Sequence, residues 1–206
     1  MRQSPDNSIL MQPDKETPPS TLQSRLIFIT GGARSGKSRY AQELALSLSD
    51  RPLYIATARN WDQEFGERIR RHQLDRDERW TAIEEEKQLS RLDLTGKIAV
   101  IDCVTLWLTN FFVDTKNDTD ASLEACKNEI DRLGTQQATL IIISNEIGMG
   151  VHADNEIGRK FTDLQGWVNQ YIAARATKVI LMVSGIPVVI KDVPIPTASL
   201  KPLTHD

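Results

Sequence analysis

The sequence predicts an α/β protein in which helices flank a mostly parallel central sheet. Short and nearly continuous apolar runs, such as LIFIT at 26–30, are typical of strands that are buried on both faces. Between these runs lie segments whose apolar residues recur at helical spacing. A glycine-rich turn comes directly after the first run. Because strands and helices alternate along the chain, we expect parallel strands joined by right-handed crossovers.

The chain up to residue 102 alternates between apolar runs and amphipathic segments. Ala41 and Ala45 share one helical face after the glycine-rich turn, and Phe65 and Ile69 share another. Pro52 opens the second apolar run, a position where a missing N–H is tolerated. The expected elements are a strand at 26–30, a helix at 39–49, a strand at 52–57, a helix at 62–73, a short strand or extended linker at 79–84 and a strand at 97–102.

The remainder of the chain repeats this alternation. Leu123, Cys126 and Ile130 mark one amphipathic helix, and Leu164 and Val168 mark a longer one. The polar sequence DTKNDTD at 114–120 is the segment within the domain where we expect disorder. The expected elements are helices at 105–113, 121–133 and 155–175, strands at 139–144 and 178–185, a glycine-rich loop at 145–155 and an additional edge strand at 186–191.

Composition and charge are those of a globular protein. The chain of 206 residues is 40% hydrophobic, and its net charge of −3 argues against a broad nucleic-acid-binding surface. It contains no apolar run of about 18 residues, so we expect no membrane span. Its two cysteines form no metal or disulfide pattern, which indicates reduced thiols in the cytoplasm. Residues 1–24 lack a signal-peptide core and are expected to be a flexible extension of a single domain at 25–206.

The turn GGARSGKS matches the phosphate-binding pattern G-x-x-x-x-G-K-[ST], with a strand before it and a helix after it. Glycines let backbone N–H groups point at phosphate oxygens, and the next helix adds its positive N-terminal end. Lys37 is expected to reach the β- and γ-phosphates, and the Ser38 hydroxyl to ligate Mg²⁺. The alternative is a glycine turn without a ligand. The candidate nucleotide-binding residues are Gly31, Gly32, Ala33, Arg34, Ser35, Gly36, Lys37 and Ser38.

Two acidic residues come after predicted strands, at the edge where ligands of open α/β sheets collect. Asp102 ends KIAVID and is expected to hold the Mg²⁺ shell together with Ser38. Its alternative role is to cap the next helix. Glu146 comes after LIIISN and is either a second acid of the site or an ordinary loop carboxylate.

The residues at the ends of the predicted strands narrow the type of phosphate-binding protein. A switch GTPase reads guanine with an N-K-x-D motif, whereas the corresponding place here reads SNEIG. Motor and recombination ATPases usually carry basic DNA-binding loops or have much longer chains. The size of this chain favours a small kinase that transfers a phosphoryl group to a small molecule.

Several stretches together resemble one family over about residues 26–191: ITGGARSGKSRYAQELA, LYIATA, RIRRHQLDRDERWTAIEE, IDCVTLWLTN, SNEIGMGVHADNEIGRKF and VILMVSGIPVVIK. They are similar to the bifunctional adenosylcobinamide kinase/adenosylcobinamide-phosphate guanylyltransferases of cobalamin biosynthesis. The resemblance implies a RecA-like P-loop fold, a homotrimer, adenosylcobinamide as the corrinoid substrate, and ATP and GTP as nucleotide substrates with Mg²⁺. The family phosphorylates adenosylcobinamide and then transfers GMP from GTP onto that phosphate.

The resemblance gives His72, in RIRRHQLDRDERW, the role of the histidine that becomes guanylylated. A neutral imidazole is a good nucleophile toward an α-phosphorus, and the nearby Arg70, Arg71 and Arg76 disfavour the imidazolium form. The alternative is that His72 packs on an apolar helix face together with Ile69. His72 and Lys37 are therefore the candidate catalytic residues.

Further positions match family segments that contact nucleotide. They are Ala56, Thr57, Ala58, Gln73, Leu74, Asp75, Arg76, Glu84 and Asp102. An ordinary strand exit at 56–58 and a solvated carboxylate at Glu84 are the alternatives. Asp102 stands where the family often has Glu, and His152 and His205 are expected to be incidental. The competing functions are guanylyl transfer alone, or a regulatory NTPase that uses hydrolysis as a switch.

Overall fold

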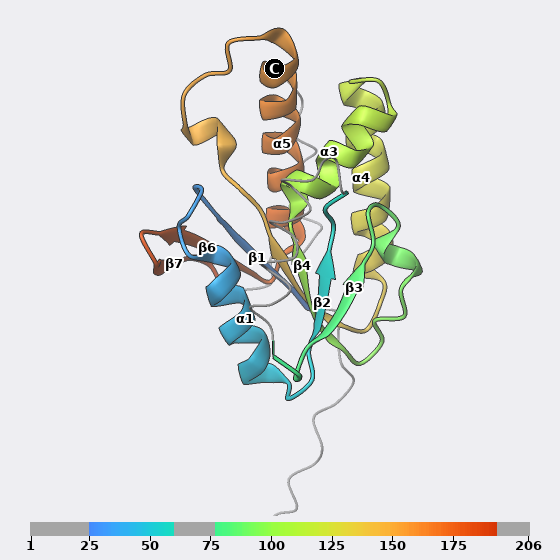
Figure 1. The fold of residues 1–206 in the computed structure, drawn as a ribbon, viewed down its shortest axis with the longest axis vertical. Helices are drawn as coiled ribbons and strands as arrows, with labels where there is room; N and C mark the ends of the chain where they lie inside the picture. Colours follow the sequence, from blue (N-terminus) through green and yellow to red (C-terminus); the bar gives the residue numbers. More distant parts are fainter. Residues whose placement is uncertain (1–24, 60–76, 193–206) are drawn as a thin grey trace, which may run out of the picture.

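A computed structural model describes residues 25–59 and 77–192. They form one seven-stranded sheet, with the strands in the order β3-β2-β4-β5-β1-β6-β7, and the helices that flank it (Figure 1). All neighbouring strands pair in parallel except β6 and β7, which form an antiparallel hairpin at one edge. The strands are β1 (Arg25–Gly31), β2 (Leu53–Ala56), β3 (Thr81–Glu84), β4 (Ile98–Asp102), β5 (Thr139–Ile143), β6 (Lys178–Val183) and β7 (Ile186–Lys191).

Helices cover both faces of the sheet. On one face, α1 packs on β1, β4 and β5, and on the other face α3, α4 and α5 pack together. The helices are α1 (Lys37–Leu48), α3 (Val104–Asp114), α4 (Thr119–Gly134) and α5 (Glu156–Arg175), with short 3-10 turns η1 (Leu89–Arg91) and η2 (Ile147–Met149). This arrangement confirms the predicted α/β class with a mostly parallel sheet and helices on either side.

Two apolar cores explain why the central strands read as continuous apolar runs. Successive side chains of a strand point to opposite faces, so Ile27 and Ile29 join the core under α1 while Leu26 and Phe28 join the core under α3, α4 and α5. These four side chains are at most 5% exposed, so both faces of β1 are buried along residues 26–29. The strand order also places β5 between β1 and β4.

Most predicted elements lie where the sequence indicated. One open alternative is settled, and one prediction is wrong. Residues 81–84 form a strand that pairs in parallel with β2, so this segment is more than a linker. The predicted disorder at 114–120 is wrong. Asp118 Oδ1 accepts a hydrogen bond from the Ala121 N–H at 2.9 Å and caps α4, which begins at Thr119. The predicted extension at 1–24 and the helix at 62–73 lie outside the described residues.

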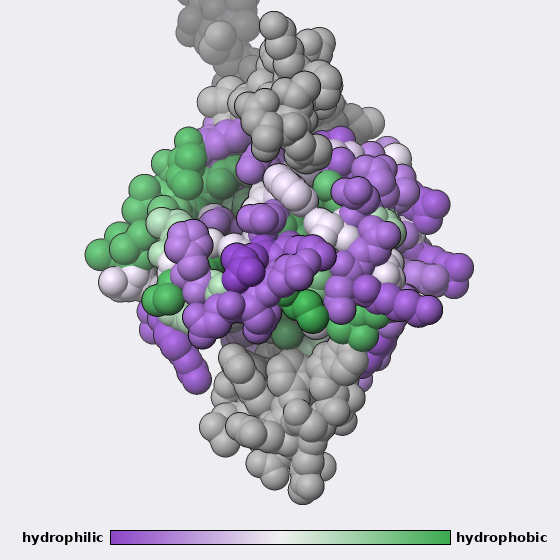
Figure 2. Space-filling model, turned by 90° about the horizontal axis from the view of Figure 1, so that it is seen from above, coloured by the Kyte–Doolittle hydropathy of each residue, from purple (hydrophilic) through white to green (hydrophobic). Residues whose placement is uncertain are grey.

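The hairpin of β6 and β7 carries an exposed apolar surface. Val188, Val189 and Ile190 are 46%, 51% and 61% exposed, and β7 pairs only with β6 in the described sheet. Figure 2 shows apolar side chains gathered at the side of the molecule where this hairpin lies in Figure 1. Among the helices that the structure describes, none combines the length and apolar content needed to cross a bilayer.

Gly31, the last residue of β1, is required by close packing. Its φ of 149° is unfavourable for a side chain, and a Cβ at this position would lie 2.5 Å from the Met182 carbonyl oxygen on β6. The backbone of β6 cannot retreat without breaking its parallel pairing with β1. The residue at position 31, where the glycine-rich turn begins, must therefore be glycine.

We expect Gly31→Ala to lower the free energy of unfolding by about 1–3 kcal/mol, because the added methyl group overpacks the contact with β6. Urea denaturation measures this change. Gly134→Ala is the matched control, since a Cβ there meets no atom within 4 Å and stability should not fall. Equal stability of the two variants would contradict the steric argument.

Candidate active site

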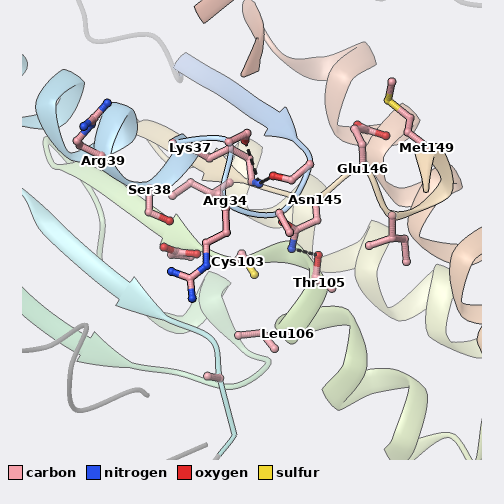
Figure 3. A pocket seen from close by; sticks show the side chains of 18 of the residues that line it. Arg34, Lys37, Ser38, Arg39, Cys103, Thr105, Leu106, Asn145, Glu146 and Met149 are labelled. Atoms are coloured by element: carbon pink, nitrogen blue, oxygen red, sulfur yellow. Dashed lines mark hydrogen bonds between the residues drawn. The ribbon is translucent and has the colours of Figure 1, made fainter. Parts of the chain in front are cut away.

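A pocket of about 860 Å³ opens at the carboxyl ends of β1, β2, β4 and β5 (Figure 3). Parallel strands bring their carboxyl ends to one edge of the sheet, so residues far apart in the sequence meet there. The lining residues are Gly32, Ala33, Arg34, Ser35, Gly36, Lys37, Ser38, Arg39, Tyr54, Ala56, Ala58, Asp102, Cys103, Thr105, Leu106, Ile143, Asn145, Glu146, Ile147, Met149 and Gly150.

The glycine-rich turn forms one wall of the pocket and leads into α1. Gly36 has φ 94° and Arg34 has φ 59°, both in the left-handed region. Among the described residues no side chain caps the N-terminus of α1, and Gly36, Lys37 and Ser38 line the pocket, so the positive end of this helix faces it. The turn rests on the β6–β7 connection, because the Gly185 N–H donates to the Ser35 carbonyl at 3.0 Å.

Lys37 lies buried at the centre of this wall. Its Nζ donates hydrogen bonds to the carbonyl oxygens of Gly31 at 2.9 Å and Gly32 at 2.6 Å. Burial lowers the pKa of Lys37, and the neighbouring Cys103, Asp102 and Glu146 act in the opposite direction. The Nζ of Lys37 thus has two carbonyl acceptors and lies near two carboxylates, and its position in the pocket wall suits the binding of phosphate oxygens.

Asp102, at the end of β4, has one oxygen engaged and one available. Tyr54 donates from its hydroxyl group to Asp102 Oδ2 at 2.6 Å. None of the described residues donates a hydrogen bond to Oδ1, and the residue lines the pocket together with Ser38. An oxygen in this position can accept from a metal-bound water or join a metal shell.

Glu146, which lies just after β5, is held close to the glycine-rich turn by its backbone and its side chain. Its N–H donates to the Gly31 carbonyl at 3.1 Å, the same oxygen that accepts from Lys37. Its Oε1 accepts from the Thr30 hydroxyl at 2.5 Å and from Asn169 Nδ2 at 3.2 Å. The carboxylate is therefore a fixed part of the pocket wall.

The structure brings together most of the predicted site residues that it describes. Residues 32–38 of the glycine-rich turn, Ala56, Ala58 and Asp102 line one pocket, and Glu146 joins them. Three predicted positions do not line it. Gly31 packs against β6, and Glu84 is exposed at the end of β3. Thr57 is buried, with its hydroxyl group donating to the Cys103 carbonyl at 2.8 Å.

Five predicted site residues lie outside the described part of the chain: His72, Gln73, Leu74, Asp75 and Arg76. Arg70, Arg71 and His205, which the sequence analysis also mentioned, lie outside it as well. His152 is exposed in the loop before α5 and does not line the pocket.

Several site residues were missed by the sequence analysis. Tyr54 orients Asp102, and Asn145 donates from Nδ2 to the Thr105 hydroxyl at 2.9 Å, which ties the end of β5 to the start of α3 (Figure 3). Asn169 comes from the middle of α5. In the sequence, Asn145 is marked only by its position just after an apolar run that predicts a strand. No local sequence pattern distinguishes Tyr54 or Asn169 from other residues of a strand or helix.

Comparisons with known proteins agree on one family. The family profile described as cobinamide kinase / cobinamide phosphate guanyltransferase matches residues 27–190. The chain is 38% identical over 172 residues to the bifunctional adenosylcobalamin biosynthesis protein CobP of Pseudomonas aeruginosa, covering 81% of this chain and 98% of that protein. It is 39% identical over 181 residues to the corresponding protein CobU of Escherichia coli and 40% identical over 183 residues to that of Salmonella typhimurium, covering 81% of this chain and 99% of each.

Among solved structures, a KaiC-like protein of Pyrococcus horikoshii aligns with a TM-score of 0.45 at 12% identity, covering 76% of this chain and 70% of that chain.

Cys103 lines the pocket, and its thiol is predicted to be unreactive. Burial, and then the nearby Asp102 carboxylate, raise the pKa of Cys103 to about 12, and burial raises that of Cys126 as well. A thiol with a raised pKa stays protonated at pH 8, and only the thiolate reacts with iodoacetamide. Folded protein at pH 8 should therefore take up almost no iodoacetamide, as measured by mass spectrometry. Labelling should increase as the pH approaches 12. Protein unfolded in urea is the control, in which both thiols should react; rapid stoichiometric labelling of folded protein at pH 8 would refute the assignment.

Proposed function

The chain belongs to the cobinamide kinase/cobinamide phosphate guanyltransferase family, and from this premise we propose how its residues divide the two reactions. The protein is a bifunctional enzyme of adenosylcobalamin biosynthesis, with cobinamide and nucleoside triphosphates as its substrates. The observation that carries the assignment of residues is the pocket in which the glycine-rich turn, Lys37, Ser38 and Asp102 meet. This pocket is proposed to hold the triphosphate of ATP or GTP.

The phosphate-binding role is a consequence of charge and backbone geometry. Backbone N–H groups at the start of α1 and the Lys37 ammonium group supply the positive potential that a triphosphate needs. In phosphoryl transfer the same groups stabilise the charge on the transferring oxygens. Arg34, which is exposed and points into the pocket in Figure 3, adds a second cation on the solvent side.

Ser38 and Asp102 are the residues proposed to hold Mg²⁺. No cluster of three or more His, Cys, Asp or Glu side chains is found in the described ranges, so protein side chains alone do not form a metal cage there. One hydroxyl group and one carboxylate fit Mg²⁺, which commonly keeps waters and takes its remaining ligands from substrate phosphates. When bound, the ion would neutralise charge between the phosphates.

His72 is proposed to carry GMP between GTP and adenosylcobinamide phosphate. In the first step an imidazole nitrogen attacks the α-phosphorus, a P–N bond forms, and the bond to pyrophosphate breaks. In the second step a phosphate oxygen of the corrinoid attacks the same phosphorus, a P–O bond forms, and the P–N bond breaks to restore His72. The proposal is supported by the sequence RIRRHQLDRDERW, which resembles the family segment with the guanylylated histidine, and by the nucleophilicity of neutral imidazole.

Labelling with GTP that carries ³²P at the α-phosphorus tests this step. Wild-type protein should retain a label after denaturing electrophoresis that is labile to acid and stable to base. His72→Ala should lose the label and guanylyl transfer but keep phosphorylation of adenosylcobinamide, because the glycine-rich turn is unchanged. Lys37→Ala should lose both activities by about 10²-fold or more, since both use the same charge stabilisation.

The exposed His152 provides the matched control, because His152→Ala should label like wild type. Retention of the label in His72→Ala would sink the histidine assignment. Release of inorganic phosphate without any covalent label or transfer to corrinoid would instead favour a regulatory NTPase.

A homotrimer is proposed as the assembled form, with β7 in its subunit interface. This is supported by the resemblance to the family and by the exposed apolar side chains of Val188, Val189 and Ile190 on an unpaired strand edge of the described sheet. Burial of an exposed apolar strand is a common way of protecting such an edge. The cytoplasm is proposed as the location, supported by two buried free thiols.

We expect Val189→Glu to shift the protein from trimer toward monomer, because a buried carboxylate without a partner is strongly unfavourable in an interface. Sedimentation velocity measures the distribution of species. Leu48→Glu, at a similarly exposed site at the end of α1, should leave the assembly unchanged. If Val189→Glu sediments like wild type, β7 does not form the interface.

A further inference from the structure

We propose that Glu146 is the general base of the phosphorylation reaction, with Oε2 accepting the proton of the alcohol that attacks the γ-phosphorus. This inference rests on the proposed function, since it assigns a residue to one of the two reactions. It gives a catalytic role to a carboxylate that the nucleotide-binding motif does not contain.

The position of Glu146 places it beside the phosphate-binding groups. β5 lies between β1, which leads into the glycine-rich turn, and β4, which ends in Asp102. The Gly31 carbonyl accepts from both the Glu146 N–H and Lys37 Nζ, so the two residues share one anchor. In Figure 3, Ser38 lies on one side of Lys37 and Glu146 on the other. The proposed metal side and the Glu146 side of the pocket are thus distinct.

The hydrogen bonds of Glu146 leave one oxygen available. Thr30 and Asn169 both donate to Oε1, and no described residue donates to Oε2. Within the described ranges no Lys or Arg forms an ion pair with this carboxylate either. A carboxylate that is fixed through one oxygen and open at the other can accept a proton without losing its position.

A buried polar network holds this arrangement. Asn169 is 6% exposed and also donates from Nδ2 to the Asn145 carbonyl at 3.0 Å. Its Oδ1 accepts from the Ser144 hydroxyl at 2.6 Å and from Gln165 Nε2 at 3.0 Å. Buried polar side chains are costly unless they are paired. Asn169 and Gln165 donate to Asn145 and Ser144, which precede Glu146 in the chain, while Gln165 Oε1 has no partner among the described residues. The network thus acts as a support for one carboxylate.

The rim next to Glu146 suits a bulky acceptor with apolar surface. Met149 lines the pocket and is 75% exposed, and Val151 is 96% exposed. A corrinoid is far larger than the alcohol that reacts, so its ring must stay at the rim while the alcohol reaches inward. Ile147 and Met149 line the pocket beside Glu146 and therefore offer apolar contacts on the side from which we propose that the alcohol approaches.

The alcohol oxygen attacks the γ-phosphorus, and a new P–O bond forms. The bond from the γ-phosphorus to the bridging oxygen breaks, and the nucleoside diphosphate leaves. The alcohol proton passes to Oε2 of Glu146 and then to solvent. Lys37 stabilises the phosphoryl oxygens throughout.

Glu146→Gln tests the proposal, because the amide keeps the shape and an oxygen for Thr30 but cannot take the proton. Phosphorylation is followed with ATP labelled at the γ-phosphate and adenosylcobinamide. Guanylyl transfer is assayed separately with GTP and adenosylcobinamide phosphate supplied directly. We expect kcat of phosphorylation to fall by about 10²–10³-fold with little change in KM for ATP. Guanylyl transfer should stay within about threefold of wild type, because the base acts only on the alcohol.

Two further comparisons separate catalysis from structure. Glu124→Gln, on the exposed face of α4, is the matched control and should behave like wild type in both assays. Thr30→Val removes the shorter of the two hydrogen bonds to Oε1 and should lower kcat of phosphorylation by about tenfold, whereas Thr30→Ser should restore it. Thermal unfolding of each variant reports whether the fold is intact.

Three outcomes would overturn the proposal: wild-type phosphorylation by Glu146→Gln, an equal loss of both activities in that variant, or equal effects of Thr30→Val and Thr30→Ser on an intact fold. An equal loss would place Glu146 in nucleotide or metal binding. Absence of both activities in the wild-type protein would be a failure of the proposed function and is distinguishable from these results.

Discussion

Parallel pairing of β1, β5 and β4 is the constraint on which the site depends. Ile29 is in register with Ile143, and Ile143 is in register with Asp102, so β5 and β4 end at one level of the sheet and β1 ends two residues beyond it, at Gly31. The chain turns after each strand, and the glycine-rich turn, Glu146 and Asp102 are thereby brought to one pocket. Both faces of these strands are buried, so a shift of one residue would exchange the side chains of the two cores.

Electrostatics in the pocket centre on a buried ammonium group. Lys37 is held by two carbonyl oxygens of the glycine-rich turn and lies near the carboxylates of Asp102 and Glu146. Each carboxylate has one oxygen satisfied by a hydroxyl group, from Tyr54 in one case and Thr30 in the other. This pairing lowers the cost of placing three charged groups in a partly buried pocket, and it leaves the second oxygen of each acid without a donor among the described residues.

Elements far from the glycine-rich turn in the sequence hold parts of the pocket in place. The turn between β6 and β7 supports the glycine-rich turn through the hydrogen bond from the Gly185 N–H to the Ser35 carbonyl. The strand β7 carries the exposed apolar side chains that are proposed to lie in the subunit interface. On the opposite face of the sheet, α5 holds Glu146 through Asn169. In the proposed assignment, both transfers share the groups that bind the triphosphate, and each acceptor is handled by a separate group.

The fold class, the strands of the core and the position of the glycine-rich turn were all predictable from the sequence, because continuous apolar runs and the GGARSGKS pattern are local signals. Asp102 and Glu146 were predictable as candidates for the same reason, since each lies at the end of an apolar run. Only the tertiary structure decided that Thr57 faces the core, that segment 114–120 is an ordered turn and that Asn169 supports Glu146. These features depend on contacts between residues far apart in the chain, or on which way one side chain turns at a strand end. The spacing of apolar residues in the sequence shows which face of one helix or strand is buried. It does not show which other element packs on that face, and it does not show how a side chain is oriented at the end of a strand.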